Sequence, residues 1–135
     1  KRLMPFTNSC ANPISSKING MKSECGYCFF CLMRRAGLHW VGWDEEVHNC
    51  RDILKMPDIL CHPKKSKDIK AILLGIRTWA QNPQKLLDNL LIDVPEAKVL
   101  TPYYYIRPLL SSGFRELAQL IQDKNPAILR SFVNW

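Results

Sequence analysis

Four cysteines near the start of the chain, Cys10, Cys25, Cys28 and Cys31, have the spacing of a metal site. The last three form the run C-G-Y-C-F-F-C, in which two C-x-x-C steps share their middle sulfur. Each step lets two thiolates bind one ion while backbone N–H groups face the sulfurs, and Gly26 eases the first turn. Four thiolates fill the tetrahedral shell of Zn²⁺ and leave no position for water. The sequence therefore predicts structural zinc and no catalytic metal.

Other uses of the six cysteines stay open, namely disulfides or reduced thiols packed in a core. Secreted domains with this cysteine density are shorter and poorer in helix signals, so cysteine usage favours metal binding in a reducing cytoplasm. A second site could form from His48, Cys50, Cys61 and His62, but these residues lack a C-x-x-C turn and are more typical of packed or free side chains. A cysteine nucleophile would need a general base positioned to act on its thiol, which the local sequence does not establish, so we predict no catalytic residue.

Two arginines, Arg34 and Arg35, follow Cys31 by three and four residues, within a helix that we expect from Leu32 to about Trp40. Guanidinium groups bind phosphate, carboxylate or RNA. Both arginines are therefore candidate substrate-binding residues. The alternatives are solvated charges or an ion pair with Glu24.

Length and composition fit one globular domain, since 135 residues with 47% apolar content can bury a sizeable core. We expect a soluble protein, because no stretch approaches the roughly 18 uncharged apolar residues of a membrane span. The net charge of +7 would favour a polyanionic partner such as nucleic acid or a nucleotide. Trp40, Trp43 and the tyrosines at 103–105 could stack on a base, although such aromatics are more typical of a core.

The elements that must position these residues fall into two zones. Residues 1–63 hold all the cysteines and histidines and are predicted to form loops, a zinc knuckle and one helix. Residues 64–135 carry apolar side chains at spacings of three and four, which indicate helices. The predicted fold is mainly α: a zinc-knuckle region followed by a bundle of about four to five helices, within one compact domain. A short strand near residues 4–6 is the one exception that we expect.

Helix starts are marked by capping residues. Ser66 is the expected N-cap of the first bundle helix, with Asp68 in the first turn, where the helix dipole favours a carboxylate. Asn or Thr followed by proline marks three further starts. These prolines are Pro83, Pro102 and Pro126, and Pro108 must kink or split the helix that follows Pro102.

Three segments resemble the C-terminal zinc motif of 7-cyano-7-deazaguanine synthases, the QueC family. They are S-C-A-N-P at 9–13, C-G-Y-C-F-F-C at 25–31 and L-M-R-R-A-G-L-H at 32–39. In that family a serine-cysteine pair precedes C-G-x-C-x-x-C-x-x-R, and four cysteines hold structural zinc. The run R-R-A-x-L-H followed by W-x-G-x-D, here at 34–44, is most similar to the QueC-like proteins of bacterial antiphage systems, the QatC type.

The resemblance implies part of a PP-loop ATPase. QueC relatives bind ATP in an N-terminal lobe with an S-G-G-x-D-S loop and activate 7-carboxy-7-deazaguanine as an adenylate, which a nitrogen nucleophile attacks. This chain has no such loop, so the resemblance implies a C-terminal part or a split subunit that is inactive alone and whose ATP is bound by the nucleotide-binding lobe. The deazaguanine ligand would lie between that lobe and the zinc region, with Arg34 facing substrate or phosphate. A defence-system protein would be a further partner.

Two other classes of function stay open. A zinc-knuckle nucleic-acid binder would use the same thiolates with the +7 charge, and its affinity would fall steeply with salt. A protein-interaction module would instead use the helical tail as its docking surface.

Overall fold

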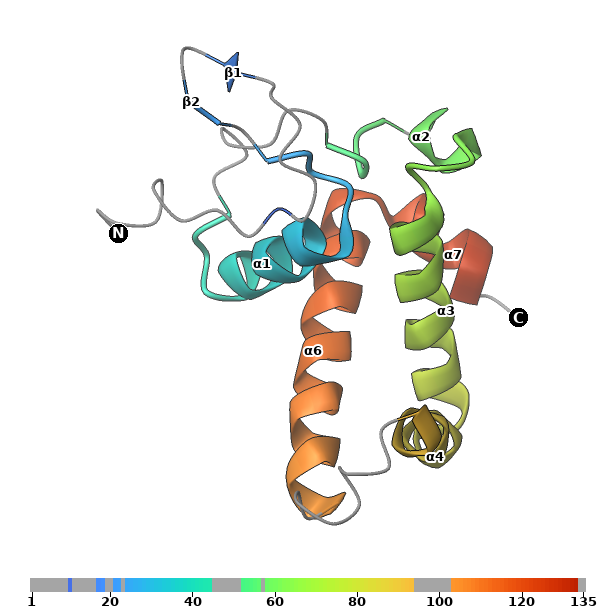
Figure 1. Ribbon diagram of the computed structural model, residues 1–135. Coiled ribbons are helices and arrows are strands. Elements are labelled where there is room, and N and C mark those ends of the chain that lie inside the picture. The colour runs from blue at the N-terminus through green and yellow to red at the C-terminus, as the bar shows by residue number, and fades with distance from the viewer. Residues whose placement is uncertain are drawn as a thin grey trace.

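A computed structural model describes residues 10, 17–18, 21–22, 24–44, 52–56, 58–93 and 103–133. The strand expected near residues 4–6 lies outside these ranges. Within them the protein is mainly α, as predicted (Figure 1). The elements are β1 (Lys17–Ile18), β2 (Met21–Lys22), α1 (Phe29–Trp40), α2 (Asp58–Cys61), α3 (Lys67–Gln81), α4 (Pro83–Asp93), α6 (Tyr103–Lys124) and α7 (Pro126–Val133).

The core forms where α1, α3, α6 and α7 meet. α6 packs against α1, α3 and α7, and α3 also contacts α1, α4 and α7. In Figure 1, α3 and α6 run side by side, α1 lies across one end of α6, and α4 lies at the far end of α3. The side chains buried in this core are apolar residues at helical spacing, and their removal from water is the main stabilising term. They include Leu32, Ile69, Ile72, Leu73, Leu117, Leu120 and Ile121.

Two of the predicted proline starts are confirmed. Pro83 and Pro126 are the first residues of α4 and α7. Asn82 and Asn125 cap these helices, since their Oδ1 atoms accept hydrogen bonds of 3.0 and 3.3 Å from the N–H groups three residues later. Pro102 lies outside the described residues, and α6 begins at the next residue.

Ser66 stands at the N-cap position of α3, but it makes no capping hydrogen bond through its side chain. Its dihedral angles are helical, because the chain enters α3 through a turn in which the Ser66 N–H donates to the His62 carbonyl at 3.1 Å. An N-cap serine needs an extended backbone to reach the following N–H groups. The hydroxyl is instead buried.

Pro108 does not split its helix, which runs as one element through the proline. Proline lacks an N–H, so the carbonyl of Tyr104 loses its partner four residues later. Because Pro108 lies in the second turn of α6, the loss is confined to one hydrogen bond near a helix end. None of the helices in the described ranges combines the length and apolar content needed to cross a bilayer.

The short strands β1 and β2 pair antiparallel between Cys10 and Cys25 in the chain. Lys17 pairs with Lys22 and Ile18 with Met21, so the sequence between them is the turn-forming Asn19-Gly20 pair. Two-residue strands are too short for an alternating pattern to reveal them.

Candidate metal centre

The structure brings the four predicted ligands together. The Sγ atoms of Cys10, Cys25, Cys28 and Cys31 all lie within 4.8 Å of one another. Cys28 and Cys31 are 3.3 Å apart at sulfur, Cys25 and Cys31 3.8 Å, and Cys10 and Cys28 4.0 Å. A regular tetrahedron with Zn–S bonds of about 2.3 Å has sulfur–sulfur edges of about 3.8 Å. The four sulfurs therefore form a group that could hold one metal ion.

A disulfide does not explain these distances, because its sulfur–sulfur bond is about 2.05 Å. All the cysteines in the described residues are free thiols, and three of the cluster, Cys25, Cys28 and Cys31, are buried. Cys10 is partly exposed. The geometry favours metal binding over a disulfide framework.

Local backbone conformation places the sulfurs. Gly26 has a φ of 74°, the positive region that glycine tolerates, and this turns the chain between Cys25 and Cys28. Cys28 is the N-cap of α1, and Cys31 lies in its first turn. α1 begins at Phe29, three residues before the start expected at Leu32. The backbone N–H of Cys25 also donates to the Cys10 sulfur at 3.5 Å, across the hairpin loop.

Burial sets the electrostatics of the sulfurs. Desolvation raises the pKa of Cys25 to about 12 and raises the pKa of Cys31 further. Backbone N–H groups of Tyr27 and Cys28 oppose the shift at Cys25 without cancelling it. Thiols with such pKa values are neutral at pH 7, so a cation must supply the charge that stabilises the thiolates. This donor set fits zinc, which would replace the thiol protons.

Arg34 pairs with Glu24, one of the alternatives expected from the sequence. Its Nη1 donates to Glu24 Oε1, and both side chains are largely buried. Glu24 directly precedes Cys25, so this ion pair ties α1 back onto the cysteine segment. An anionic ligand bound by Arg34 would compete with Glu24.

Arg35 faces the interior, with 3% of its side chain exposed. Its Nε donates to both oxygens of Asp44 at 3.1 and 3.2 Å, and its Nη1 donates to Asp52 Oδ1 at 2.6 Å. Burial alone would lower the pKa of Arg35, but the bonds and charges of Asp52 and Asp44 outweigh it and raise the pKa. These contacts connect α1 to the segments that follow it, and a ligand would have to displace a carboxylate to reach Arg35.

Polar side chains also connect the C-terminal ends of α1 and α6. His39 Nε2 lies 2.8 Å from Asp123 Oδ2, and Lys124 Nζ lies 3.4 Å from Asp44 Oδ2. The hydrogen bond from His39 lowers the pKa of Asp123. The sequence does not reveal the partner carboxylates, because no local pattern relates residues 84 positions apart.

The weaker candidate site is not assembled in the part of the chain that the structure describes. Cys61 and His62 are exposed, and His62 Nδ1 accepts hydrogen bonds from the N–H groups of Lys64 and Lys65 at 3.2 and 3.3 Å. Neither residue belongs to a group of metal ligands within the described ranges. His48 and Cys50 lie outside those ranges.

Comparison of the chain with protein-family models, with curated proteins and with solved structures gave no match. The cysteine geometry and the sequence motifs of this chain are therefore the basis for a functional proposal.

Proposed function

We propose that this chain is the zinc-binding C-terminal part of a QueC-like, ATP-dependent enzyme that processes 7-deazaguanines. The observation that carries the proposal is the cysteine cluster, whose four sulfurs lie within 4.8 Å of one another. The run C-G-x-C-x-x-C-x-x-R and the upstream serine-cysteine pair of that family are both present around this cluster.

Zinc in such a site would be structural. Four thiolates complete its coordination, so it would bind no water and activate no substrate. Its role would be to hold the segment around Cys10 and the Cys25 turn against the start of α1. ATP and the phosphate-binding loop would belong to the nucleotide-binding lobe, carried by the same protein or by a separate subunit.

The contribution of this chain to substrate binding would come from the surface beside the zinc. Arg34 is the candidate, because Arg35 is enclosed by two carboxylates while 18% of the Arg34 side chain is exposed. Arg34 would exchange Glu24 for a phosphate or carboxylate of the substrate when the nucleotide-binding lobe is in place. This exchange also predicts that Glu24→Gln, which removes the competing negative charge, strengthens anion binding.

The finer form of the proposal places the protein in phage defence. The segments R-R-A-x-L-H and W-x-G-x-D at 34–44 support it through their similarity to QatC-type proteins. In that role the activated deazaguanine would be joined to an amine of a partner protein.

The test uses the chain together with a nucleotide-binding lobe, found as an S-G-G-x-D-S motif in the same reading frame or in a neighbouring gene. The assembled protein, given ATP, 7-carboxy-7-deazaguanine and a nitrogen nucleophile such as ammonia, should release pyrophosphate as the adenylate forms and AMP as the nucleophile displaces it. Neither part alone should do so. Arg34→Ala should lower the rate, whereas Arg130→Ala, at an exposed position of α7, should not. Absence of substrate-dependent AMP from the assembled protein would contradict the proposal.

A nucleic-acid binder is the second candidate, favoured by one observation. Trp40 and Trp43 are 51% and 40% exposed, and this aromatic surface could stack on a base in a chain of net charge +7. This candidate predicts that a single-stranded RNA oligonucleotide binds with an affinity that falls steeply with salt and is reduced by Trp40→Ala. The enzyme proposal predicts no such binding.

A further inference from the structure

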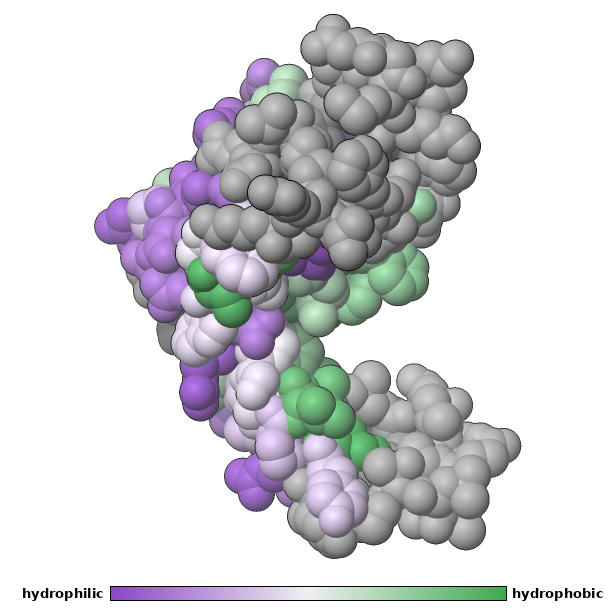
Figure 2. All heavy atoms as spheres, turned by 90° about the vertical axis from the view of Figure 1, so that its left-hand side faces the viewer, coloured by the Kyte–Doolittle hydropathy of each residue, from purple (hydrophilic) through white to green (hydrophobic). Residues whose placement is uncertain are grey.

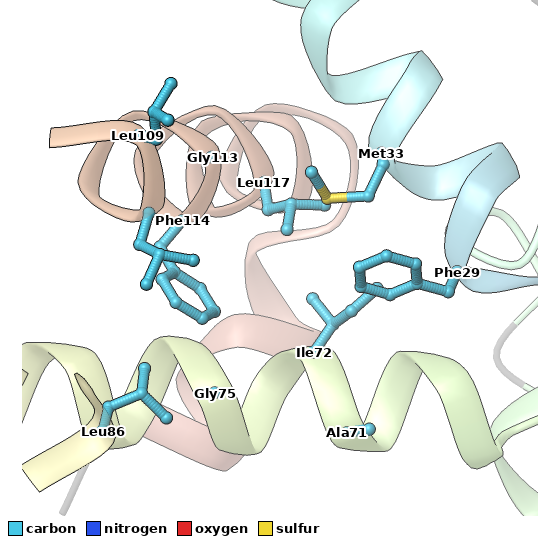
Figure 3. A pocket seen from close by; sticks show the side chains of 11 residues that line it. Phe29, Met33, Ala71, Ile72, Gly75, Leu86, Leu109, Gly113, Phe114 and Leu117 are labelled. Atoms are coloured by element: carbon cyan, nitrogen blue, oxygen red, sulfur yellow. The ribbon is translucent and has the colours of Figure 1, made fainter. Parts of the chain in front are cut away.

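An apolar pocket of about 310 Å³ lies between α1, α3, α4 and α6. Phe29 and Met33 of α1 face Ile72 of α3 and Leu117 of α6 across it, and Phe114 closes one wall (Figure 3). In the space-filling view the surface is hollowed beside a strip of apolar residues on the right-hand side (Figure 2). The described lining is made of apolar side chains and glycines, so the described residues offer the pocket no charged group.

Phe29 belongs to this pocket and to the metal centre at once. It lies between the ligands Cys28 and Cys31, and its ring lines the pocket. Its backbone N–H donates to Asp68 Oδ2 on α3 at 2.7 Å. The conformation of the turn from Cys28 to Cys31 therefore sets where one wall of the pocket stands.

We propose that metal binding at the four cysteines and binding of an uncharged apolar molecule in this pocket are linked through Phe29. The inference rests on the metal centre of the proposed function and not on its deazaguanine substrate. Metal would hold the Cys28 turn, the turn would hold Phe29 against Asp68, and the completed wall would bind the ligand.

Packing alone does not hold this wall. Phe29 is 45% exposed, so burial holds its ring only in part. The buried cysteines form a small cluster with Cys10 and Tyr27, and Tyr27 also packs against the main core. A cluster of this size stabilises little by itself, and its order should depend on the metal, as in other small thiolate sites.

The pocket itself selects the ligand class. Its volume lies at the lower end of small-molecule sites, which span about 300–1,000 Å³. A deazaguanine would lose its hydrogen bonds to water there and find no polar side chain among the described lining residues, which costs free energy. An uncharged aromatic or alkyl molecule has no such loss, so it is the occupant that we assign.

The experiment measures binding of N-phenyl-1-naphthylamine, an uncharged apolar fluorophore, to the full chain in zinc-loaded and chelator-treated forms. Zinc content is measured separately by elemental analysis, and helix content by circular dichroism. The zinc-loaded chain should bind the probe saturably, and removal of zinc should weaken binding about tenfold, a usual size for coupling between two sites. By reciprocity, saturating probe should slow zinc loss to a chelator.

Two variants distinguish probe binding in this pocket from probe binding to a loosened core. Ala71 lines the pocket at an exposed position of α3, so Ala71→Leu should abolish probe binding without changing zinc content. Ala127→Leu, at an exposed position of α7, is the matched control and should change neither. Only the probe signal that Ala71→Leu removes is attributed to this pocket. The effect of zinc on probe binding is evaluated on that part of the signal.

Breaking the link while zinc stays bound gives the sharpest outcome. Asp68→Ala should weaken probe binding at unchanged zinc content, and Asp68→Asn, which keeps an acceptor oxygen, should restore it. A chain that binds no zinc would contradict the metal centre itself. A chain that binds zinc but holds the probe equally well with and without it, or regardless of Ala71→Leu, would overturn the linkage alone.

Discussion

Asp68 Oδ2 on α3 accepts a 2.7 Å hydrogen bond from the backbone N–H of Phe29, the first residue of α1. The first turn of α1 has no acidic residue, and its N-cap, Cys28, makes no capping bond through its side chain. Asp68 therefore gives α1, from another helix, the acceptor and negative charge that helix N-termini favour. The same carboxylate also lies in the first turn of its own helix, as expected from the sequence.

Loss of this carboxylate should destabilise the fold. Asp68→Ala leaves the Phe29 N–H without its acceptor, which should lower the free energy of unfolding by about 1 kcal/mol. Urea denaturation followed by circular dichroism measures the change. Asp88→Ala, which removes a carboxylate bonded to Gln84 within α4, should have a smaller effect. Equal effects of the two variants would contradict a capping role for Asp68.

Zinc should be present at about one ion per chain and should depend on the cluster cysteines alone. Cys28→Ser should remove the metal and loosen the segment before α1, because a serine hydroxyl replaces a thiolate in the ligand set. Elemental analysis and hydrogen exchange measure these effects. Cys61→Ser changes an exposed cysteine outside the cluster and should leave the zinc content unchanged. Loss of zinc in that control would show that the ligands are wrongly assigned.

Zinc retention should fall as the pH falls. Burial raises the pKa of Cys25 to about 12, so this thiol gives up its proton at pH 7 only in exchange for the metal. Protons released on binding compete for the same sulfurs, and the apparent affinity must rise with pH. Titration with a competing chelator at pH values between 6 and 8, in steps of about one pH unit, measures how the apparent zinc affinity changes with pH. An affinity independent of pH would exclude thiol ligands with raised pKa values.

Local sequence signals predicted the parts of the structure that depend on neighbours in the chain. The C-x-x-C spacing placed Cys25, Cys28 and Cys31 together, and the proline starts placed α4 and α7. The start of α1 was predicted too late, because the half-exposed Phe29 and Phe30 give no amphipathic pattern between two ligand cysteines.

Contacts between distant segments could not be predicted in the same way. Asp68 and Phe29 are 39 positions apart, and His39 and Asp123 are 84 apart. Such pairs depend on how helices cross, which hydrophobic periodicity does not determine. The apolar pocket could not be predicted from the sequence for the same reason, since its walls come from separate helices.

The buried charges around Arg35 should be important for stability. Asp52→Ala removes the acceptor of a 2.6 Å bond from the Arg35 guanidinium, whose side chain is only 3% exposed. Breaking a buried ion pair in this way should cost about 3 kcal/mol. Asp52→Asn keeps an acceptor oxygen and should cost less. Asp58→Ala, at an exposed position of α2, is the control, and a similar loss there would show that the Asp52 effect is unspecific.

Two glycines on helices that face each other should respond oppositely to alanine. A Cβ on Gly75 would lie 2.8 Å from Phe114 Cε1, a ring that stacks on Trp79 with centroids 5.7 Å apart. Gly75→Ala must displace this ring and should destabilise the protein by about 1–3 kcal/mol, as overpacking does. A Cβ on Gly113 would meet Met33 at 3.7 Å, an ordinary contact, so Gly113→Ala should stabilise α6 by up to about 1 kcal/mol. Thermal unfolding of both variants tests this difference. Helix propensity alone predicts that alanine raises the stability at both positions, so changes of opposite sign would reveal the contact with Phe114.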